Sequence, residues 1–270
     1  MLAACATSPQ ATNDKPAIPG HKQQVVELLK SIETGASKPV AYINPDKYIQ
    51  HNLAVGEGLA GVKALLQSMP KGSTRVSTVR VFEDGDFVFA HTEYNFFGPK
   101  IGFDIFRFEN GKIVEHWDNL QETAAKPSPS SHTMTDGPTI AGDLDKTAAN
   151  KALMQSYMDD LLQGRKEKFT SYFDGSNYIQ HSPLVADNLG GLFAGLQALA
   201  KQGLAVKYDK VRMLLAEGSF VLVVAEGSFG GRPSAYYDLY RIQNGKIAEH
   251  WDTIEAIPPR AEWKNPNGKF

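Results

Sequence analysis

The chain has 270 residues, of which 42% are hydrophobic and 21% are charged, so it can form one large domain or two ordinary ones. Its net charge of −2 lacks the basic excess of general nucleic-acid-binding proteins, and no apolar run approaches the length of about 18 residues that a transmembrane helix needs. Its single cysteine, Cys5, excludes an intrachain disulfide and a cysteine-based zinc site.

The amino terminus resembles a lipid-attachment signal. Residues 2–5, Leu-Ala-Ala-Cys, have the pattern of a bacterial lipobox, and the polar, proline-containing residues that follow up to position 20 are typical of a flexible tether. The charged and apolar regions that normally precede a lipobox are not found before it, so a chance match is the alternative. We expect Cys5 to be a lipidation site and residues 1–20 to be disordered, in a periplasmic or outer-membrane lipoprotein. A cytoplasmic protein is the alternative.

Two helices and four strands are predicted in the first half of the chain. Apolar residues at helical spacing between positions 25 and 32 are followed by Gly35, and a second helix is predicted at 59–69. Three β-rich runs and a fourth strand after Asn110-Gly111 then complete an antiparallel meander. The three runs and the fourth strand span 75–82, 87–96, 101–108 and 112–120. Helices followed by such a meander indicate an α+β domain, with helices packed on one face of a curved antiparallel sheet.

The last hairpin can adopt two registers. A two-residue turn at 110–111 would place Asp104 opposite Trp117. A three-residue loop with Gly111 as a bulge would instead pair Asp104 with His116.

We favour the bulged register because it explains the charged residues. It places Asp104, His116 and Asp118 on one face of the sheet, and it brings Arg107 near Glu115 on the other face as a cross-strand ion pair.

The whole pattern is repeated. Tyr-Ile-Gln-His at 48–51 recurs at 178–181, and Asn-Gly-Lys-Ile-x-Glu-His-Trp-Asp at 110–118 recurs at 244–252. A duplicated domain explains this self-similarity. We therefore expect domains at 21–122 and 143–270, joined by a linker at 123–142.

These motifs resemble the SnoaL-like polyketide cyclases of the nuclear transport factor 2-like superfamily. The resemblance rests on the Tyr-Ile-Gln-His run, the following helix, and the strand hairpin that ends in Glu-His-Trp-Asp, and it covers both copies. The segments 131–138 and 265–268 also resemble tails of such proteins. The resemblance implies two tandem cone-shaped domains, each a curved antiparallel sheet closed by helices around a deep apolar pocket. Because members often dimerise through their sheets, it also implies an intramolecular pseudo-dimer.

The resemblance further implies acid–base chemistry without a metal or cofactor. Polyketide cyclases of this family remove a proton from a carbon next to a carbonyl group and promote ring-closing aldol chemistry. By the order of elements, His51 and His181 fall at the position of the general base of ketosteroid isomerase, and Asp104 and Asp238 at that of its acidic hydrogen-bond donor. A histidine at the base position departs from that enzyme, so the steroid reaction is not implied.

The titratable side chains of the repeated motifs are the candidate catalytic residues, because imidazole and buried carboxyl groups transfer protons near neutral pH. They are His51, Asp104, His116, Asp118, His181, Asp238, His250 and Asp252. Aromatic side chains of the same motifs are candidate substrate contacts: Tyr48, Phe106, Trp117, Tyr178, Tyr240 and Trp251. A structural reading stays open for each, since a buried histidine can hold a strand end by hydrogen bonds.

The candidate residues also raise the question of a metal site. His51, Asp104, His116 and Asp118 include the ligand types of a two-histidine carboxylate centre, but no histidines at close helical spacing support one, so we expect no metal. His91 has Val224 as its counterpart, and the two pockets are therefore not identical.

The sequence thus predicts a cofactor-independent cyclase, isomerase or lyase that acts on a small apolar carbonyl compound. A histidine would abstract the proton, and an aspartic acid would stabilise the enolate. The alternative is a non-catalytic protein of the cell envelope that binds a small apolar ligand.

Overall fold

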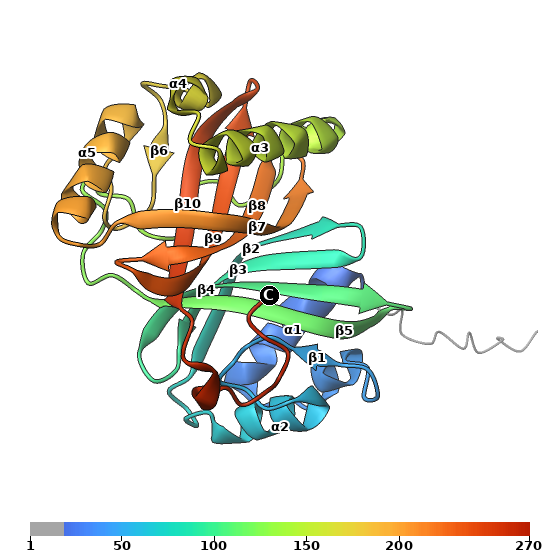
Figure 1. Ribbon diagram of the computed structural model, residues 1–270. Helices are drawn as coiled ribbons and strands as arrows, with labels where there is room; N and C mark the ends of the chain where they lie inside the picture. Colours follow the sequence, from blue (N-terminus) through green and yellow to red (C-terminus); the bar gives the residue numbers. More distant parts are fainter. Residues whose placement is uncertain (1–18) are drawn as a thin grey trace, which may run out of the picture.

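The computed structural model describes residues 19–270 (Figure 1). The predicted lipidation site Cys5 and nearly all of the predicted tether lie outside these residues. In the part of the chain that is described, no helix is both long and apolar enough to cross a membrane.

The first domain follows the predicted order of elements. Helix α1 (His21–Thr34) ends at Gly35, whose φ of 69° gives the left-handed C-cap that glycine adopts without a steric penalty. The remaining elements are η1 (Lys38–Tyr42), β1 (Ile49–Gln50), α2 (Gly58–Ser68), β2 (Arg75–Asp84), β3 (Phe87–Asn95), β4 (Pro99–Glu109) and β5 (Lys112–Glu122). The strands form one sheet in the order β1-β5-β4-β3-β2, in which only β1 runs parallel to its neighbour.

The second domain repeats this architecture. Its elements are η2 (Leu144–Lys146), α3 (Thr147–Leu162), α4 (Lys166–Phe169), η3 (Thr170–Tyr172), β6 (Ile179–Gln180), α5 (Asn188–Lys201), β7 (Val206–Glu217), β8 (Phe220–Phe229), β9 (Arg232–Gln243), β10 (Lys246–Ala256) and η4 (Arg260–Glu262). Its sheet has the equivalent order β6-β10-β9-β8-β7. The predicted α+β class and the two tandem helix-on-sheet domains are confirmed.

The predicted position of the hairpin bulge is wrong, although the predicted face is right. Glu109 pairs with Lys112 across a two-residue turn, and the register shifts at Val114, one residue beyond Ile113. The extra residue restores the side-chain alternation that the bulge at Gly111 was expected to provide. The strand pairing is therefore displaced by two residues from the prediction.

As a result, Asp104 lies opposite Asp118, and Phe106 lies opposite His116. Asp104, His116 and Asp118 still share one face, because a displacement of two residues does not change side-chain parity. Arg107 pairs with Glu115 on the other face, and its Nη2 lies 2.6 Å from Glu115 Oε2.

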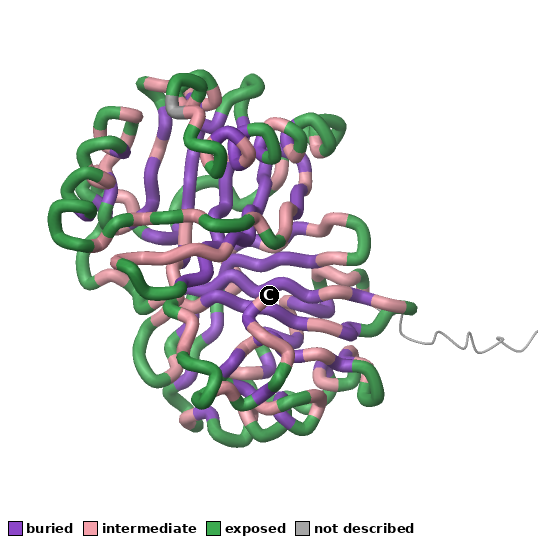
Figure 2. Tube along the Cα trace, viewed as in Figure 1, coloured by how far each residue is buried: buried purple, intermediate pink, exposed green. Residues whose placement is uncertain are grey.

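The two sheets pack face to face through their uncovered sides. Helices lie at opposite ends of the molecule, with the sheets between them (Figure 1), and buried strand residues fill the centre (Figure 2). Phe82 of β2 stacks on Phe220 of β8 with ring centroids 4.5 Å apart. Asn119 of β5 donates from Nδ2 to the main-chain oxygen of Thr253 of β10 at 2.8 Å. This interface is a third apolar core, separate from the core inside each domain.

The segment that follows each sheet crosses to the other domain. After β5, the chain runs over the second domain, where Ser130 Oγ accepts a hydrogen bond from the main-chain N–H of Asp187 at 2.8 Å. After β10, it runs over the first domain, where Asn265 Nδ2 donates to the main-chain oxygens of Asn52 and Val55 at 2.7 and 3.0 Å. Each domain is thus completed by the tail of the other.

Candidate functional site

The cavity that contains the repeated polar residues lies in the first domain, between the sheet and helices α1 and α2. Its volume is about 770 Å³, which is within the range of small-molecule sites. Most of its wall is apolar. The polar side chains on the wall are Tyr48, Gln50, Asn52, Ser68, Tyr94, Lys100, Asp104, His116, Asp118 and Lys264.

Asp104 and His116 form a buried hydrogen-bonded pair at this wall. Asp104 Oδ1 lies 3.1 Å from His116 Nε2, and Asp104 Oδ2 accepts a hydrogen bond from the Tyr94 hydroxyl at 2.6 Å. Burial and the nearby Asp104 raise the pKa of Tyr94 well above its ordinary value, so the phenol keeps its proton and remains a donor.

Gln50 determines which nitrogen of His116 carries a proton. The Gln50 Oε1 atom accepts the main-chain N–H of Asn52 at 2.9 Å, which fixes the orientation of the amide. The same oxygen lies 2.9 Å from His116 Nδ1, so Nδ1 must be the donor. His116 Nε2 faces Asp104 Oδ1, and these two atoms can hold one proton between them.

Asp118 is the carboxyl group with a free oxygen. Its Oδ2 accepts a hydrogen bond from Asn52 Nδ2 at 2.5 Å. Its buried Oδ1 has no hydrogen-bond partner among the described residues, although Lys269 Nζ from the C-terminal segment lies 3.8 Å away. A buried carboxyl oxygen without a partner carries a desolvation cost that a proton or a hydrogen-bond donor would offset.

The structure does not bring His51 into the pocket. Because β1 alternates its side chains, Gln50 faces the pocket and His51 faces the opposite side of the sheet. There, His51 Nε2 lies 2.9 Å from Glu115 Oε1, and the ring stacks on Trp117 at 4.8 Å between centroids. Burial opposes ionisation of Glu115, but hydrogen bonds from His51 and Arg107 lower its pKa overall.

His181 has the equivalent position in the second domain, on the side of the sheet away from the pocket. Its Nε2 lies 2.8 Å from Glu249 Oε1, and its ring stacks on Trp251. The expectation that His51 and His181 act in the pockets beside the aspartates is therefore corrected. Trp117 and Trp251 also belong to the core between the sheets rather than to the pocket walls. Their predicted contact with substrate is likewise not supported by their positions.

The second domain has an equivalent but smaller pocket, of about 250 Å³. Tyr178, Tyr240, His250 and Asp252 line it, and His250 Nε2 lies 3.0 Å from Asp238 Oδ1.

Aromatic side chains reduce the volume of the second pocket. Phe173 lies where the first domain has Ile43, since each forms the same isolated bridge to its sheet, and Tyr240 lies where the first domain has Phe106. Both aromatic residues line the smaller pocket, together with Phe169. The first pocket is thus the one with room for a substrate.

Asp252 differs from its counterpart Asp118 in its electrostatic setting. Burial raises the pKa of Asp252 to about 6, although the neighbouring His250 lowers it. The Oδ1 atom of Asp252 is buried and has no hydrogen-bond partner among residues 19–270.

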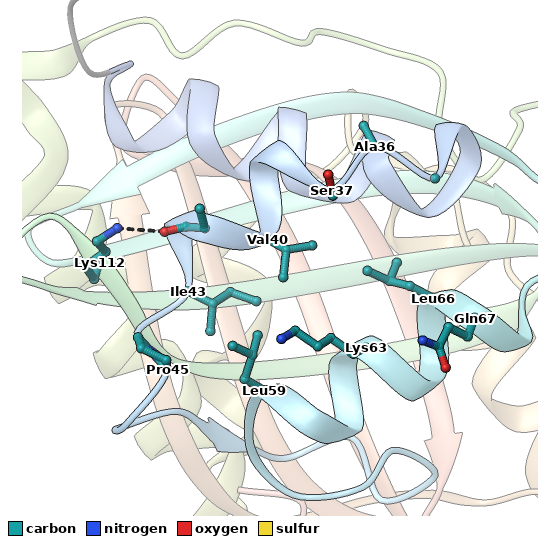
Figure 3. A pocket seen from close by; sticks show the side chains of 12 residues that line it. Ala36, Ser37, Val40, Ile43, Pro45, Leu59, Lys63, Leu66, Gln67 and Lys112 are labelled. Carbon is teal, nitrogen blue, oxygen red and sulfur yellow. Dashed lines mark hydrogen bonds between the residues drawn. The ribbon is translucent and has the colours of Figure 1, made fainter.

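Another hollow, of about 760 Å³, lies between η1 and α2 (Figure 3). It shares the side chains of Ile43 and Leu66 with the wall of the large pocket. Lys63 extends into this hollow, and Lys112 donates to the main-chain oxygen of Ala41 at 2.6 Å (Figure 3). Among the described residues, no carboxyl or imidazole group lines it, whereas Asp104, His116 and Asp118 line the pocket beside it.

The pocket triad also has the donor types of a metal site. One atom from each of Asp104, His116 and Asp118 lies within 4.8 Å of the others. One oxygen of each carboxylate already accepts a hydrogen bond, from Tyr94 and from Asn52, and His116 Nδ1 faces the amide oxygen of Gln50 rather than a carboxylate.

Sequence reasoning missed three polar residues of the first pocket. Gln50 and Asn52 were not predicted, because the reasoning from proton transfer favoured the titratable His51 between them. Strict alternation along the strand, with Tyr48 and Gln50 on one side, was a signal that could have identified Gln50. No local pattern distinguishes Tyr94 from the other aromatic residues of its strand.

Comparison with known proteins finds a similarity to one family over part of the first domain. Residues 34–116 match the family described as the SnoaL-like domain, as predicted, whereas no curated protein matches the chain. A candidate ketosteroid isomerase from Kribbella flavida DSM 17836 is 19% identical over 42% of this chain and 84% of its own, with a TM-score of 0.34. A candidate polyketide cyclase from Bacillus cereus ATCC 10987 is 18% identical over 36% and 72%, with a TM-score of 0.32. An LEH-like epoxide hydrolase from M. tuberculosis is 18% identical over 37% and 81%, with a TM-score of 0.31. Residues 34–116 are thus similar to the SnoaL-like domain, and the second domain repeats the strand order of the first.

Proposed function

We propose that the first domain is a cofactor-independent acid–base enzyme, of the cyclase, isomerase or lyase type, that acts on a small apolar carbonyl compound. The observation that carries this proposal is the juxtaposition, in a mostly apolar cavity, of the Asp118 carboxylate with the hydrogen-bonded pair of Asp104 and His116. The names of the similar structures include an isomerase, a cyclase and a hydrolase, which fits this class of chemistry.

The three side chains have complementary roles in the proposed reaction. The Asp118 carboxylate takes a proton from the carbon next to the carbonyl group. The electron pair of the broken C–H bond moves onto the carbonyl oxygen, which receives a hydrogen bond or a proton from the pair of His116 and Asp104. The resulting enol or enolate either attacks a second carbonyl carbon, which closes a ring, or is reprotonated at another carbon. A donor held in a water-poor cavity stabilises such an oxyanion more strongly than it would in water.

The test is the exchange of carbon-bound hydrogen for deuterium in a panel of small β-diketones and β-keto esters, followed by NMR. We expect the intact chain to accelerate exchange, and Asp118→Asn to lower the rate about a hundredfold or more. The matched control is Asp252→Asn in the smaller pocket, which should leave the rate unchanged. Equal losses in both variants, or undiminished exchange in Asp118→Asn, would contradict the assignment.

A second candidate function is non-catalytic binding of a small apolar ligand. The apolar wall of the cavity, with Leu28, Val62 and Phe106 among its side chains, favours it. Ligand-induced thermal stabilisation without any exchange activity in the panel would support this function. If residues 2–5 are a lipobox, the ligand would be bound at the cell envelope.

A further inference from the structure

A second group of titratable residues lies away from the pockets, where the linker crosses the second domain. His132 and Asp136 come from the linker, and His181 follows β6. One ligand-type atom from each lies within 4.8 Å of the others. The Nδ1 atom of His181 is 2.7 Å from Asp136 Oδ1, and the Nδ1 atom of His132 is 3.3 Å from Asp136 Oδ2.

The second ring nitrogen of each histidine, Nε2, lies next to a different carboxylate. His132 Nε2 lies 3.2 Å from Asp187 Oδ2, and His181 Nε2 lies 2.8 Å from Glu249 Oε1. A neutral imidazole has one N–H group and can donate to only one side. His181 Nδ1 also lies 3.0 Å from the main-chain oxygen of Thr133. Donation through Nε2 leaves each Nδ1 available as a ligand atom, and both Nδ1 atoms lie beside the carboxylate of Asp136.

This arrangement has the second coordination sphere that zinc-binding histidines usually have. A metal-bound histidine commonly donates its remaining N–H to a carboxylate, which fixes the tautomer and orients the ring. Here that partner is present twice, as Asp187 and Glu249. Glu249 is itself held by Arg241, whose Nε donates to Glu249 Oε2 at 2.6 Å.

Hydrogen bonds from Arg80 and Trp251 fix the main chain of the loop that carries Asp136. The buried guanidinium of Arg80 donates to the main-chain oxygens of Asp136 and Pro138 at 3.0 and 3.1 Å, and Trp251 Nε1 donates to that of Asp136 at 2.9 Å. Gly137 has a φ of 93°, and a Cβ atom there would lie 2.6 Å from Glu249 Oε1. The backbone around the carboxylate is thus fixed before any ion binds.

We propose that His132, Asp136 and His181 bind a divalent transition-metal ion, with zinc as the best match to two imidazoles and one carboxylate. His181 is buried, whereas the Asp136 side chain is 44% exposed, so water or another ligand can complete the coordination. The ion joins the linker of the first domain to the second domain.

The equivalent place in the first domain does not have these donors. His51 Nδ1 faces the main-chain oxygen of Gly268 at 3.0 Å, as His181 Nδ1 faces that of Thr133, but among the described residues it has no carboxylate partner. The residue that corresponds to Asp136 in the tail, one position before the glycine, is Asn267, whose amide nitrogen bonds the main-chain oxygen of Gln50 at 2.9 Å. The chain therefore contains its own matched control.

The experiment is titration of the full chain with Zn²⁺ by calorimetry after treatment with a chelator. We expect Asp136→Asn and His132→Ala each to remove one bound equivalent, and Asp187→Asn to weaken binding about tenfold or more. Asn267→Ala should bind as the unsubstituted chain does. Zn²⁺ should raise the melting temperature of the unsubstituted chain but not that of Asp136→Asn. Affinity should fall in acid, because the imidazoles must be deprotonated to bind.

Co²⁺ substitution provides an independent readout, since a visible absorption band reports a low-coordinate site and should disappear in His132→Ala. Equal melting temperatures of the chelated variants and the chelated parent chain would show that the variants fold. Absence of zinc binding in the parent chain overturns the proposal. Binding that survives both Asp136→Asn and His132→Ala but is lost in Asp118→Asn also overturns it, because the ion would then be in the pocket.

Discussion

The hydroxyl groups of Tyr94 and Tyr208 reach equivalent aspartates from strands that are not equivalent. Tyr94 of β3 donates to Asp104 at 2.6 Å, whereas Tyr208 of β7 reaches the two oxygens of Asp238 at 3.3 and 3.2 Å. Position 227 of β8, which corresponds to Tyr94, is a glycine, and Tyr208 is its direct partner across the strands. Each domain thus keeps one phenol on its buried aspartate.

We therefore expect removal of the two hydroxyl groups to lower the free energy of unfolding by different amounts. Tyr94→Phe deprives a buried carboxyl of a short hydrogen bond and should lower the free energy of unfolding by about 1.5–3 kcal/mol. Tyr208→Phe should cost less, because its contacts are longer. Urea denaturation of both variants measures the difference. A larger cost for Tyr208→Phe would contradict the geometric argument.

The raised pKa of Asp252 predicts a pH-dependent gain in stability when this carboxyl is removed. Its ordinary value is 3.8 and its value in the fold is about 6, so between these values the folded state binds more protons than the unfolded state. Stability contributed by this group therefore falls as pH rises through that window. At about 1.4 kcal/mol per pKa unit, Asp252→Asn should stabilise the protein by up to about 3 kcal/mol near pH 7.

Below about pH 3, where the carboxyl is protonated in both states, the Asp252→Asn variant should show no such gain. Denaturant midpoints measured across this pH range check the sign. A gain that is constant with pH would show that the ionisation of Asp252 is not its cause.

The exchanged C-terminal segment predicts a stability contribution from one buried amide. Asn265→Ala removes the donor for the main-chain oxygens of Asn52 and Val55. Unsatisfied buried acceptors typically cost about 1–3 kcal/mol each, so a loss of at least about 1 kcal/mol is expected in chemical denaturation. Lys264→Ala, at an exposed neighbouring side chain, is the control and should be nearly neutral. Comparable stability of both variants would show that the tail does not brace the first domain.

The core between the sheets predicts that the domains unfold together. Phe103 of β4 is fully buried there, and Phe103→Ala should cost about 3–5 kcal/mol through lost burial and the cavity left behind. Phe97, whose exposure is 68%, provides the control. Calorimetry should show one transition for the parent chain. Two independent transitions, with Phe103→Ala affecting only one, would contradict a shared core.

Local patterns in the sequence were sufficient for much of this protein. The helical spacing that ends at Gly35, the Asn-Gly turn and the repeat of Glu-His-Trp-Asp specify the elements and the duplication. The shared face of Asp104 and His116 also follows from the sequence, because strand parity depends only on whether the displacement is even. For that reason, the predicted shared face is correct although the predicted position of the bulge is wrong.

Other features depended on contacts between distant parts of the chain. Which side of the sheet His51 takes depends on the pairing of β1 with β5, because alternation separates Gln50 from His51 but does not say which of the two faces the pocket. The convergence of His132 with His181, and the cover of the first pocket by Lys264, arise from tails that cross between domains. The sequence by itself determined the two domains and the polar face of each sheet. The tertiary structure decided which pocket stays open and which histidines face it, because pocket volume and burial result from packing among several elements at once.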